Sequence, residues 1–180
     1  QVGLIFMSED FILVEDNVFS KKECENIITK YSNKTTKAKK EMLDYFFLTV
    51  SLNDFGYEDK INKVLNSYKS KFEEINKTSS LWCLGDLRFK HFKPGHSFNK
   101  WHSEHCLTYP NRVLSLQIYL SEHDCGTEFY NGKVIKSKIG RVTIFPSYFT
   151  HTHRGQVCPD KKDRYIITGY YNFNKKGKYE

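Results

Sequence analysis

The sequence predicts a mainly β fold, an antiparallel sandwich or barrel with flanking helices. Its 180 residues are 39% hydrophobic and 16% aromatic, which indicates a folded chain with a sizeable core. Helical patterns occur before residue 80, and from residue 81 onward short apolar runs alternate with Gly, Pro, Asn and Asp. Such short strands between turn residues are typical of sandwiches and barrels. We therefore expect a single domain over residues 1–180, with a supporting region at 1–80 and a β core at 81–174.

The chain is expected to begin with a strand and a helix. Residues 10–15 form an apolar run typical of a strand, whereas residues 1–7 are too short for a secretion signal, lack its basic flank and also suit a strand. Ser20 and Glu23 have the spacing of a capping box, in which each side chain accepts a hydrogen bond from the other residue's backbone N–H. A helix therefore begins after Ser20. Its apolar face consists of Cys24, Ile27, Ile28 and Tyr31.

A lysine-rich segment and a longer helix follow. Residues 32–40 are expected to form a loop, and residues 42–52 a strand, because the latter are rich in aromatic and β-branched side chains. Over residues 61–75 apolar residues then recur at helical spacing, and we expect this helix to pack on the sheet of its own domain. These residues are Ile61, Val64, Leu65, Tyr68, Phe72 and Ile75.

The β core follows in the second half. Runs bounded by turn residues predict strands at residues 84–92, 112–120, 126–130, 134–135, 141–145 and 164–173.

Composition restricts the compartment and the partners. No apolar run approaches the roughly 18 residues of a membrane span, so no membrane association is predicted. The five cysteines are odd in number and lack CxxC spacing, which favours reduced thiols in a cytoplasmic protein over a disulfide framework or a zinc site. The net charge of +7 arises largely from residues 34–40, 161–164 and 175–178, which are typical of solvated loops and a tail. A nucleic-acid partner is the minority interpretation.

Three short segments carry candidate chemistry. His102 and Glu104 are two residues apart, so on an extended chain both side chains project to one side and can bind one metal ion. His151 and His153 repeat this spacing, and either could supply a second imidazole. Two imidazoles and a carboxylate on one face of Fe(II) leave positions open for O2. Arg164 begins an apolar strand, where a guanidinium requires an anionic partner such as a carboxylate.

Each part of this pattern has a structural alternative. His105 is a competing ligand, although a continuing strand would point it away from Glu104. Histidine pairs on strands are more often solvent or core features than metal sites, and Arg164 could form a structural ion pair. Order and spacing favour the metal site, because His153 lies 51 residues beyond His102 and Arg164 lies 11 beyond His153.

These segments resemble the 2-oxoglutarate- and Fe(II)-dependent dioxygenases, specifically their prolyl 4-hydroxylase-like branch. The matching segments cover most of the chain: 11–28, 91–104, 112–120, 126–129 and 140–168. The resemblance implies a double-stranded β-helix (jelly-roll) fold. It also implies oxidative decarboxylation of 2-oxoglutarate with O2 and hydroxylation of a C–H bond, with ascorbate as reductant. The implied substrate is a prolyl residue in a peptide or protein.

The resemblance also assigns roles to residues. His102, Glu104 and His153 would bind Fe(II). Arg164 would bind the distal carboxylate of 2-oxoglutarate, assisted by the hydroxyl of Tyr119, with Thr168 nearby on the same strand. The substrate pocket could be walled by Trp101, Tyr148 and Tyr170, although all three also suit a core or another substrate.

The chain departs from the family at two positions. Glu104 stands where the family usually has aspartate, and it is one methylene longer. Phe92 stands where relatives often have a tyrosine ten residues before the first ligand. Because phenylalanine cannot donate a hydrogen bond, Tyr119 and Arg164 would carry more of the cosubstrate anchoring.

Three other functions are compatible with parts of this pattern. A nucleic-acid demethylase of the same superfamily typically has a second arginine six residues after the first, where this chain has Tyr170. A small-molecule oxygenase of the superfamily also remains open. A cupin-like, non-catalytic metal-binding barrel built on His151 and His153 would need a glutamate shortly afterwards, and residues 154–157 contain none.

Overall fold

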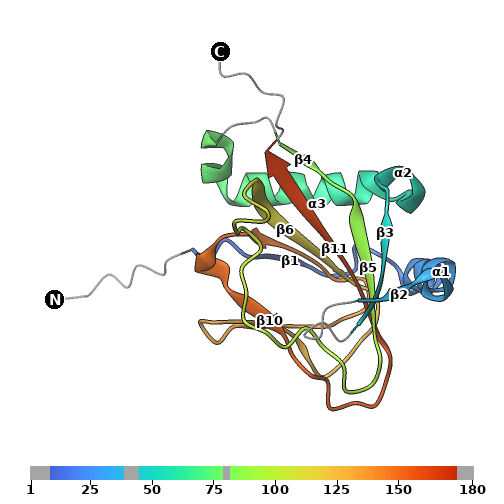
Figure 1. The fold of residues 1–180 in the computed structure, drawn as a ribbon. Helices are drawn as coiled ribbons and strands as arrows, with labels where there is room; N and C mark the ends of the chain where they lie inside the picture. Colours follow the sequence, from blue (N-terminus) through green and yellow to red (C-terminus); the bar gives the residue numbers. More distant parts are fainter. Residues whose placement is uncertain (1–8, 39–44, 79–81, 174–180) are drawn as a thin grey trace.

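The computed structural model describes residues 9–38, 45–78 and 82–173, and within them two antiparallel sheets dominate (Figure 1). The large sheet has the order β1-β9-β6-β11-β5-β3-β2, with β4 alongside β11, and the small sheet has the order β10-β7-β8. The strands of the large sheet are β1 (Leu13–Glu15), β2 (Thr36–Lys37), β3 (Phe46–Val50), β4 (Trp82–Leu84), β5 (Leu87–Phe92), β6 (Arg112–Tyr119), β9 (Val142–Pro146) and β11 (Arg164–Phe173). Those of the small sheet are β7 (Gly126–Phe129), β8 (Val134–Lys136) and β10 (His153–Gly155).

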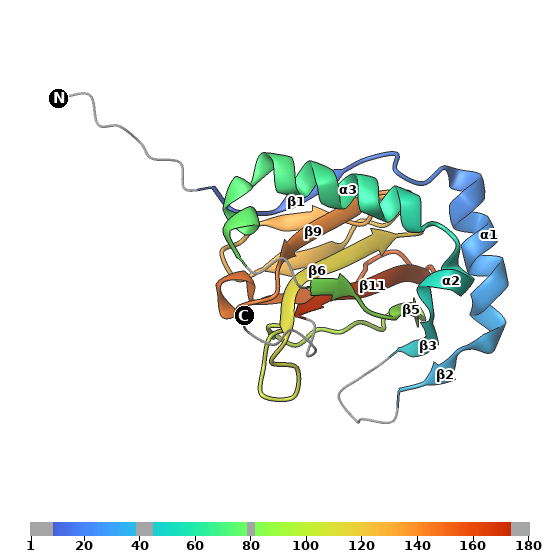
Figure 2. The same ribbon diagram turned by 90° about the horizontal axis from the view of Figure 1, so that it is seen from above.

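Helices cover one face of the large sheet, and the small sheet lies on the other side (Figures 1 and 2). Helix α3 (Glu58–Lys71) crosses the sheet, α1 (Lys21–Tyr31) lies at its end, and α2 (Leu52–Phe55) leads into α3. None of the described helices is long and apolar enough to cross a membrane.

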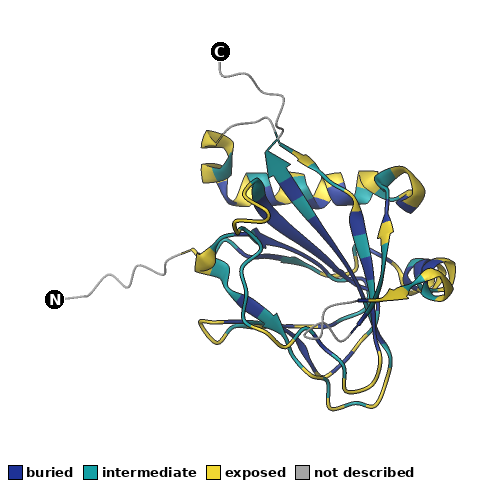
Figure 3. Cartoon of the chain, in the orientation of Figure 1, coloured by how far each residue is buried: buried dark blue, intermediate teal, exposed yellow. Residues whose placement is uncertain are grey.

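The central strands of the large sheet are largely buried (Figure 3), and their side chains contribute to two separate core clusters. On β6, the side chains of Leu114, Leu116 and Ile118 pack with those of α1 and α3, whereas Tyr119 packs with Phe129 of the small sheet. The same alternation turns Gln117 toward the small sheet. The space between the two sheets therefore receives polar as well as apolar side chains.

The N-terminal capping box is confirmed. The N–H of Glu23 donates to Ser20 Oγ at 3.2 Å, and the N–H of Ser20 donates to Glu23 Oε2 at 2.7 Å. The second helix begins and ends earlier than the expected range of 61–75, because α3 spans Glu58–Lys71 and Phe72 leaves helical conformation with φ −120° and ψ 77°. The side chain of Phe72 is buried all the same, so the apolar pattern continued past the helix end.

Several strand boundaries also differ from the prediction. The expected loop at 32–40 contains a 3₁₀ turn (Ser32–Lys34) and β2, whose strand pairs with β3. Strand β3 ends at Val50, because Ser51 caps α2 by accepting a hydrogen bond from the N–H of Asp54 at 3.2 Å. The expected strand at 84–92 is divided into β4 and β5. The predictions for residues 1–7, and for part of the segments at 32–40 and 42–52, lie outside the described residues.

The prediction of reduced thiols is wrong for one pair of cysteines. Cys125, which immediately precedes β7, is joined by a disulfide to Cys158 in the loop between β10 and β11, with a Cα–Cα distance of 4.9 Å. The fold brings together residues that are 33 positions apart, and this proximity has no signature in cysteine spacing. Cys24, Cys83 and Cys106 are free.

Candidate metal centre

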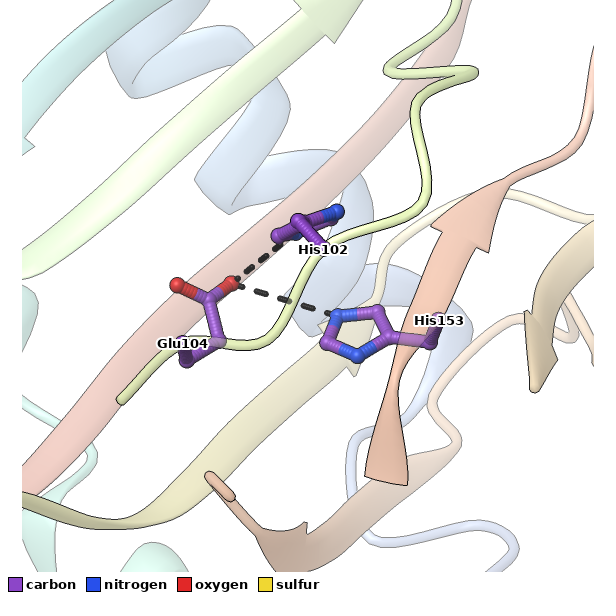
Figure 4. A group of neighbouring side chains, drawn as sticks. All are labelled: His102, Glu104 and His153. Carbon is purple, nitrogen blue, oxygen red and sulfur yellow. Dashed lines mark ion pairs between the residues drawn. The ribbon is translucent and has the colours of Figure 1, made fainter. Parts of the chain in front are cut away.

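Three of the predicted side chains converge between the two sheets (Figure 4). One ligand atom each from His102, Glu104 and His153 lies within 4.8 Å of the other two. Glu104 Oε1 is 3.4 Å from His102 Nε2 and 3.9 Å from His153 Nε2. Two nitrogen donors and one oxygen donor facing a common point form the donor set that suits Fe(II) with open positions.

The backbone fixes the spacing of the two imidazoles. His102 and His153 face each other in an isolated antiparallel bridge, where the N–H of each donates to the carbonyl oxygen of the other at 3.0 and 2.9 Å. His102 Nδ1 lies 2.7 Å from the carbonyl of Lys100, and His153 Nδ1 lies 2.9 Å from that of His151. Because a carbonyl only accepts, both Nδ1 atoms donate and both Nε2 atoms keep a lone pair toward Glu104.

Hydrogen bonds from two other side chains fix the position of the Glu104 carboxylate. Arg112 Nη1 donates to Oε2 at 2.7 Å, and the Tyr170 hydroxyl donates to Oε1 at 2.9 Å. The Arg112 guanidinium stacks between the rings of Tyr109 and Tyr170, 3.7 and 3.5 Å from their centres. Both carboxylate oxygens of the longer glutamate side chain are therefore engaged. From the sequence, Glu104 was recognised only as a departure from the usual aspartate.

Electrostatics favour a charged carboxylate and a neutral imidazole. Burial raises the pKa of Glu104, but the close contact with the His102 ring and the charge of Lys90 outweigh burial and lower that pKa to about 2. Burial, reinforced by His102, lowers the pKa of His153 to about 4. Near neutral pH both groups are therefore in the state that binds a cation.

The competing histidines point elsewhere. His151 Nε2 donates to the carbonyl of Asp10 at 2.7 Å, and its other ring nitrogen lies 2.9 Å from Thr150 Oγ1. His105 Nδ1 lies 3.2 Å from the carbonyl of Arg112, and its ring packs on Tyr148. Neither belongs to the group of three donors.

The three donors line a cavity that also contains the predicted cosubstrate residues Tyr119, Arg164 and Thr168. The side chain of Arg164 packs 4.5 Å from the centre of the Phe92 ring and is nearly buried. Within the described part of the chain, neither Arg164 Nε nor Thr168 Oγ1 has a hydrogen-bond partner, although both atoms are buried. Buried polar atoms without partners are uncommon, and here they belong to two residues that line the cavity.

Tyr119 lines the cavity, and its role in binding the cosubstrate stays a prediction. Its hydroxyl donates to Gln117 Oε1 at 2.9 Å and lies 2.8 Å from Thr127 Oγ1. Burial raises the pKa of Tyr119 to about 12, so the hydroxyl keeps its proton. In this arrangement Tyr119 belongs to a polar cluster at the cavity wall and makes no direct bond to Arg164 among the described contacts.

The three aromatic residues considered for the substrate pocket do not gather at one place. Trp101 packs on Tyr130 and on the guanidinium of Arg154, and Tyr148 packs on His105. Of the three, only Tyr170 contacts one of the candidate metal donors, through its hydrogen bond to Glu104. Neither Trp101 nor Tyr148 is among the described residues that line the cavity.

The chain is similar in structure to three prolyl hydroxylases. A viral collagen prolyl hydroxylase from Paramecium Bursaria Chlorella virus-1, solved as its 2OG complex, has a TM-score of 0.67 at 17% identity, and the match covers 96% of this chain and 100% of that chain. A Trichoplax adhaerens prolyl hydroxylase in complex with a hypoxia inducible factor peptide fragment has a TM-score of 0.71 at 12% identity, with 91% and 84% covered. A Pseudomonas putida prolyl-4-hydroxylase has a TM-score of 0.68 at 13% identity, with 92% and 94% covered. The chain has the prolyl-hydroxylase fold. No family model and no curated protein sequence matches it.

The structural similarity confirms the predicted jelly-roll fold. Four polar residues of the site were not predicted from the sequence. Lys90, Gln117 and Thr127 line the cavity, and Arg112 holds Glu104. Lys90 was detectable in principle, since it lies two residues before Phe92 and therefore shares its face of the strand. The others lie on strands whose pairing the sequence does not reveal.

Proposed function

We propose that the protein is an Fe(II)- and 2-oxoglutarate-dependent dioxygenase that hydroxylates a prolyl residue in a peptide or protein. The observation that supports it most strongly is the shared cavity. It combines two imidazoles and a carboxylate with a buried arginine whose Nε has no partner among the described residues. A metal-binding barrel without a cosubstrate gives no reason for that second feature.

The roles of the residues follow from their contacts. His102, Glu104 and His153 would hold Fe(II), which when bound supplies O2 activation coupled to decarboxylation of 2-oxoglutarate. Arg164 binds the distal carboxylate of the cosubstrate, because its planar fork matches a carboxylate and its Nε is available. Thr168 Oγ1 offers a further hydrogen bond on the same strand.

The protein environment keeps this site ordered and shields it from water. Hydrogen bonds to backbone carbonyls hold both imidazoles, and Arg112 and Tyr170 hold the carboxylate. Such outer contacts orient metal ligands and raise affinity. Apolar side chains at the cavity wall restrict solvent around the reacting groups: Phe92, Phe98 and Ile166.

The choice of a prolyl substrate rests on the neighbouring structures. All three are named as prolyl hydroxylases, and the Trichoplax protein holds a peptide fragment. Tyr170 further disfavours a nucleic-acid substrate, since its hydroxyl is engaged with Glu104 where the demethylase branch typically has arginine.

Anaerobic titration with Fe(II) and 2-oxoglutarate tests the cofactor part of this proposal. A weak visible charge-transfer band is expected for the wild-type protein and is expected to be lost in His102→Ala. Proline-containing peptides incubated with Fe(II), 2-oxoglutarate, O2 and ascorbate should then gain the mass of one oxygen atom, with succinate released in step. Absence of the band would contradict the cofactor assignment, whereas a band without peptide oxidation would contradict only the substrate.

A further inference from the structure

Lys90 is a cation in the cavity that the proposed chemistry does not use. It lies on β5 opposite Ile166 of β11, and the next residue on the same face, Phe92, lies opposite Arg164. Its side chain lines the cavity together with Glu104 and Arg164. Its ammonium group lies 5.5 Å from the centre of the Tyr45 ring, and no hydrogen bond or ion pair joins it to another described residue.

The charges around Lys90 are unbalanced. Among the described residues that line the cavity, Glu104 is the one carboxylate, and Arg112 already pairs with it. Glu104 acts on Lys90 as an opposite charge, and Arg88, Arg112 and Arg164 act on it as like charges. Burial, opposed by Glu104 and reinforced by the three arginines, lowers the pKa of Lys90 to about 8, so the amino group remains largely protonated at neutral pH.

The cosubstrate does not remove this excess. A divalent metal would add two positive charges to those of Arg112, Arg164 and Lys90, whereas Glu104 and 2-oxoglutarate supply three negative charges. Arg112 pairs with Glu104, one carboxylate of 2-oxoglutarate would pair with Arg164, and the other would bind the metal. No carboxylate of the described residues is then left to pair with the half-buried Lys90, and burying a charge is costly unless it is paired.

We propose that Lys90 binds an anionic group of the primary substrate, namely the carboxylate of an acidic residue adjacent to the one that is hydroxylated. This inference rests on the proposed function and specifies its substrate class. Because Lys90 lines the same cavity as the three metal donors, a carboxylate paired with it lies close to the reacting carbon. The net charge of +7 favours the approach of such acidic segments.

Peptide pairs with blocked termini test the proposal. The members of each pair differ only in Glu or Gln immediately before or after a central proline. Dissociation constants are measured on the metal-free protein and on the protein held anaerobically with Fe(II) and 2-oxoglutarate, and KM is measured in turnover. The wild type is expected to prefer one glutamate peptide by about tenfold to a hundredfold, the range for a hydrogen bond to a charged group.

Three variants identify the residue responsible. Lys90→Met should abolish the preference and leave the 2-oxoglutarate requirement unchanged, and Lys90→Glu should favour a peptide with lysine at that position. Lys63→Met is the matched control, because it removes the same charge from an exposed position on α3, across the large sheet from the cavity. It should retain the preference, and thermal unfolding of each variant verifies folding.

Equal affinity of the wild type for glutamate and glutamine peptides would overturn the proposal. It would also be overturned if Lys90→Met raised the 2-oxoglutarate requirement and left peptide preference intact, because Lys90 would then serve the cosubstrate. The charge-transfer band of the same samples separates the two proposals. If the protein preferred the glutamate peptide through Lys90 but showed no charge-transfer band, the anion site would stand and the oxygenase function would be wrong. If it showed the band but no preference for the glutamate peptide, the oxygenase cofactors would stand and the anion site would be wrong.

Discussion

Arg164 is the residue at which stability and ligand affinity should change in opposite directions. Its side chain is 6% exposed, its Nη1 contacts Cys125 Sγ at 3.4 Å, and no described carboxylate forms an ion pair with it. Burial lowers the pKa of Arg164 to about 10, which leaves the guanidinium charged at neutral pH. Without a ligand, the protein therefore contains a buried positive charge that has no anionic partner among the described residues.

Arg164→Met removes that charge and keeps an apolar stem of similar length. Hydrophobic replacement of buried ionic groups is commonly neutral or stabilising by about 1–4 kcal/mol, so the free energy of unfolding without ligand should stay unchanged or rise. The same change removes charge-assisted hydrogen bonds to 2-oxoglutarate. Their loss costs about 1.5–3 kcal/mol, roughly tenfold to more than a hundredfold in affinity.

Denaturant unfolding with and without the cosubstrate measures both effects. At 100 times its Kd, 2-oxoglutarate should stabilise the Fe(II)-loaded wild type by about 2.7 kcal/mol. A hundredfold loss of affinity would reduce this to about 0.4 kcal/mol at the same concentration. Arg164→Lys, which keeps the charge and loses the fork, should fall between the two. If Arg164→Met destabilised the ligand-free protein by several kcal/mol and kept the full cosubstrate effect, Arg164 would be a structural cation and the reasoning would be wrong.

Three further outcomes are expected. His153→Ala should lose Fe(II) binding in anaerobic titration, and His151→Ala should keep it. If instead His151→Ala lost Fe(II) binding and His153→Ala kept it, His151 would be the metal ligand. Tyr170→Phe removes one of the hydrogen bonds that orient Glu104, and it should weaken Fe(II) binding about 10- to 100-fold, the usual cost of an outer contact; unchanged affinity would mean that the remaining contacts suffice. Hydrogen bonds from Arg141 and Lys138 lower the pKa of Asp16 from 3.8 to about 2. The stability that this carboxylate contributes is therefore present above pH 3.8 and is lost as the pH falls toward 2. Acid unfolding of Asp16→Asn should accordingly show a flatter dependence on pH in that window, and an unchanged slope would show that the pair contributes nothing.

Local chemistry made part of the fold predictable. Ser20 and Glu23 determine a helix start by contacts within one turn, and strand β11 has the predicted bounds because its apolar run ends in polar residues on both sides. Helix α3 ended early, since Phe72 continued the apolar pattern from a non-helical conformation. Periodicity reports which side chains are buried, and it does not report where the backbone changes conformation.

Contacts between distant segments account for what the sequence did not reveal. The spacing of His102, Glu104 and His153 was informative, but the carbonyls that orient the imidazoles and the arginine behind Glu104 depend on strand pairing. The Cys125–Cys158 disulfide depends in the same way on a loop that returns to the start of β7.

The bridge between His102 and His153 has a consequence for how the proposed metal site would be filled. The backbone and two carbonyls hold both imidazoles, so the ligand pair is complete once the chain has folded. A preformed set of two nitrogens and one oxygen has no geometric means of rejecting neighbouring first-row ions, and copper or nickel binds such sets more tightly than ferrous iron. The occupant is then decided by which ion is available when folding finishes. If the proposed function is correct, protein purified from cells rich in another metal should be correctly folded but hold that metal, and it should be inactive until the ion is exchanged for Fe(II).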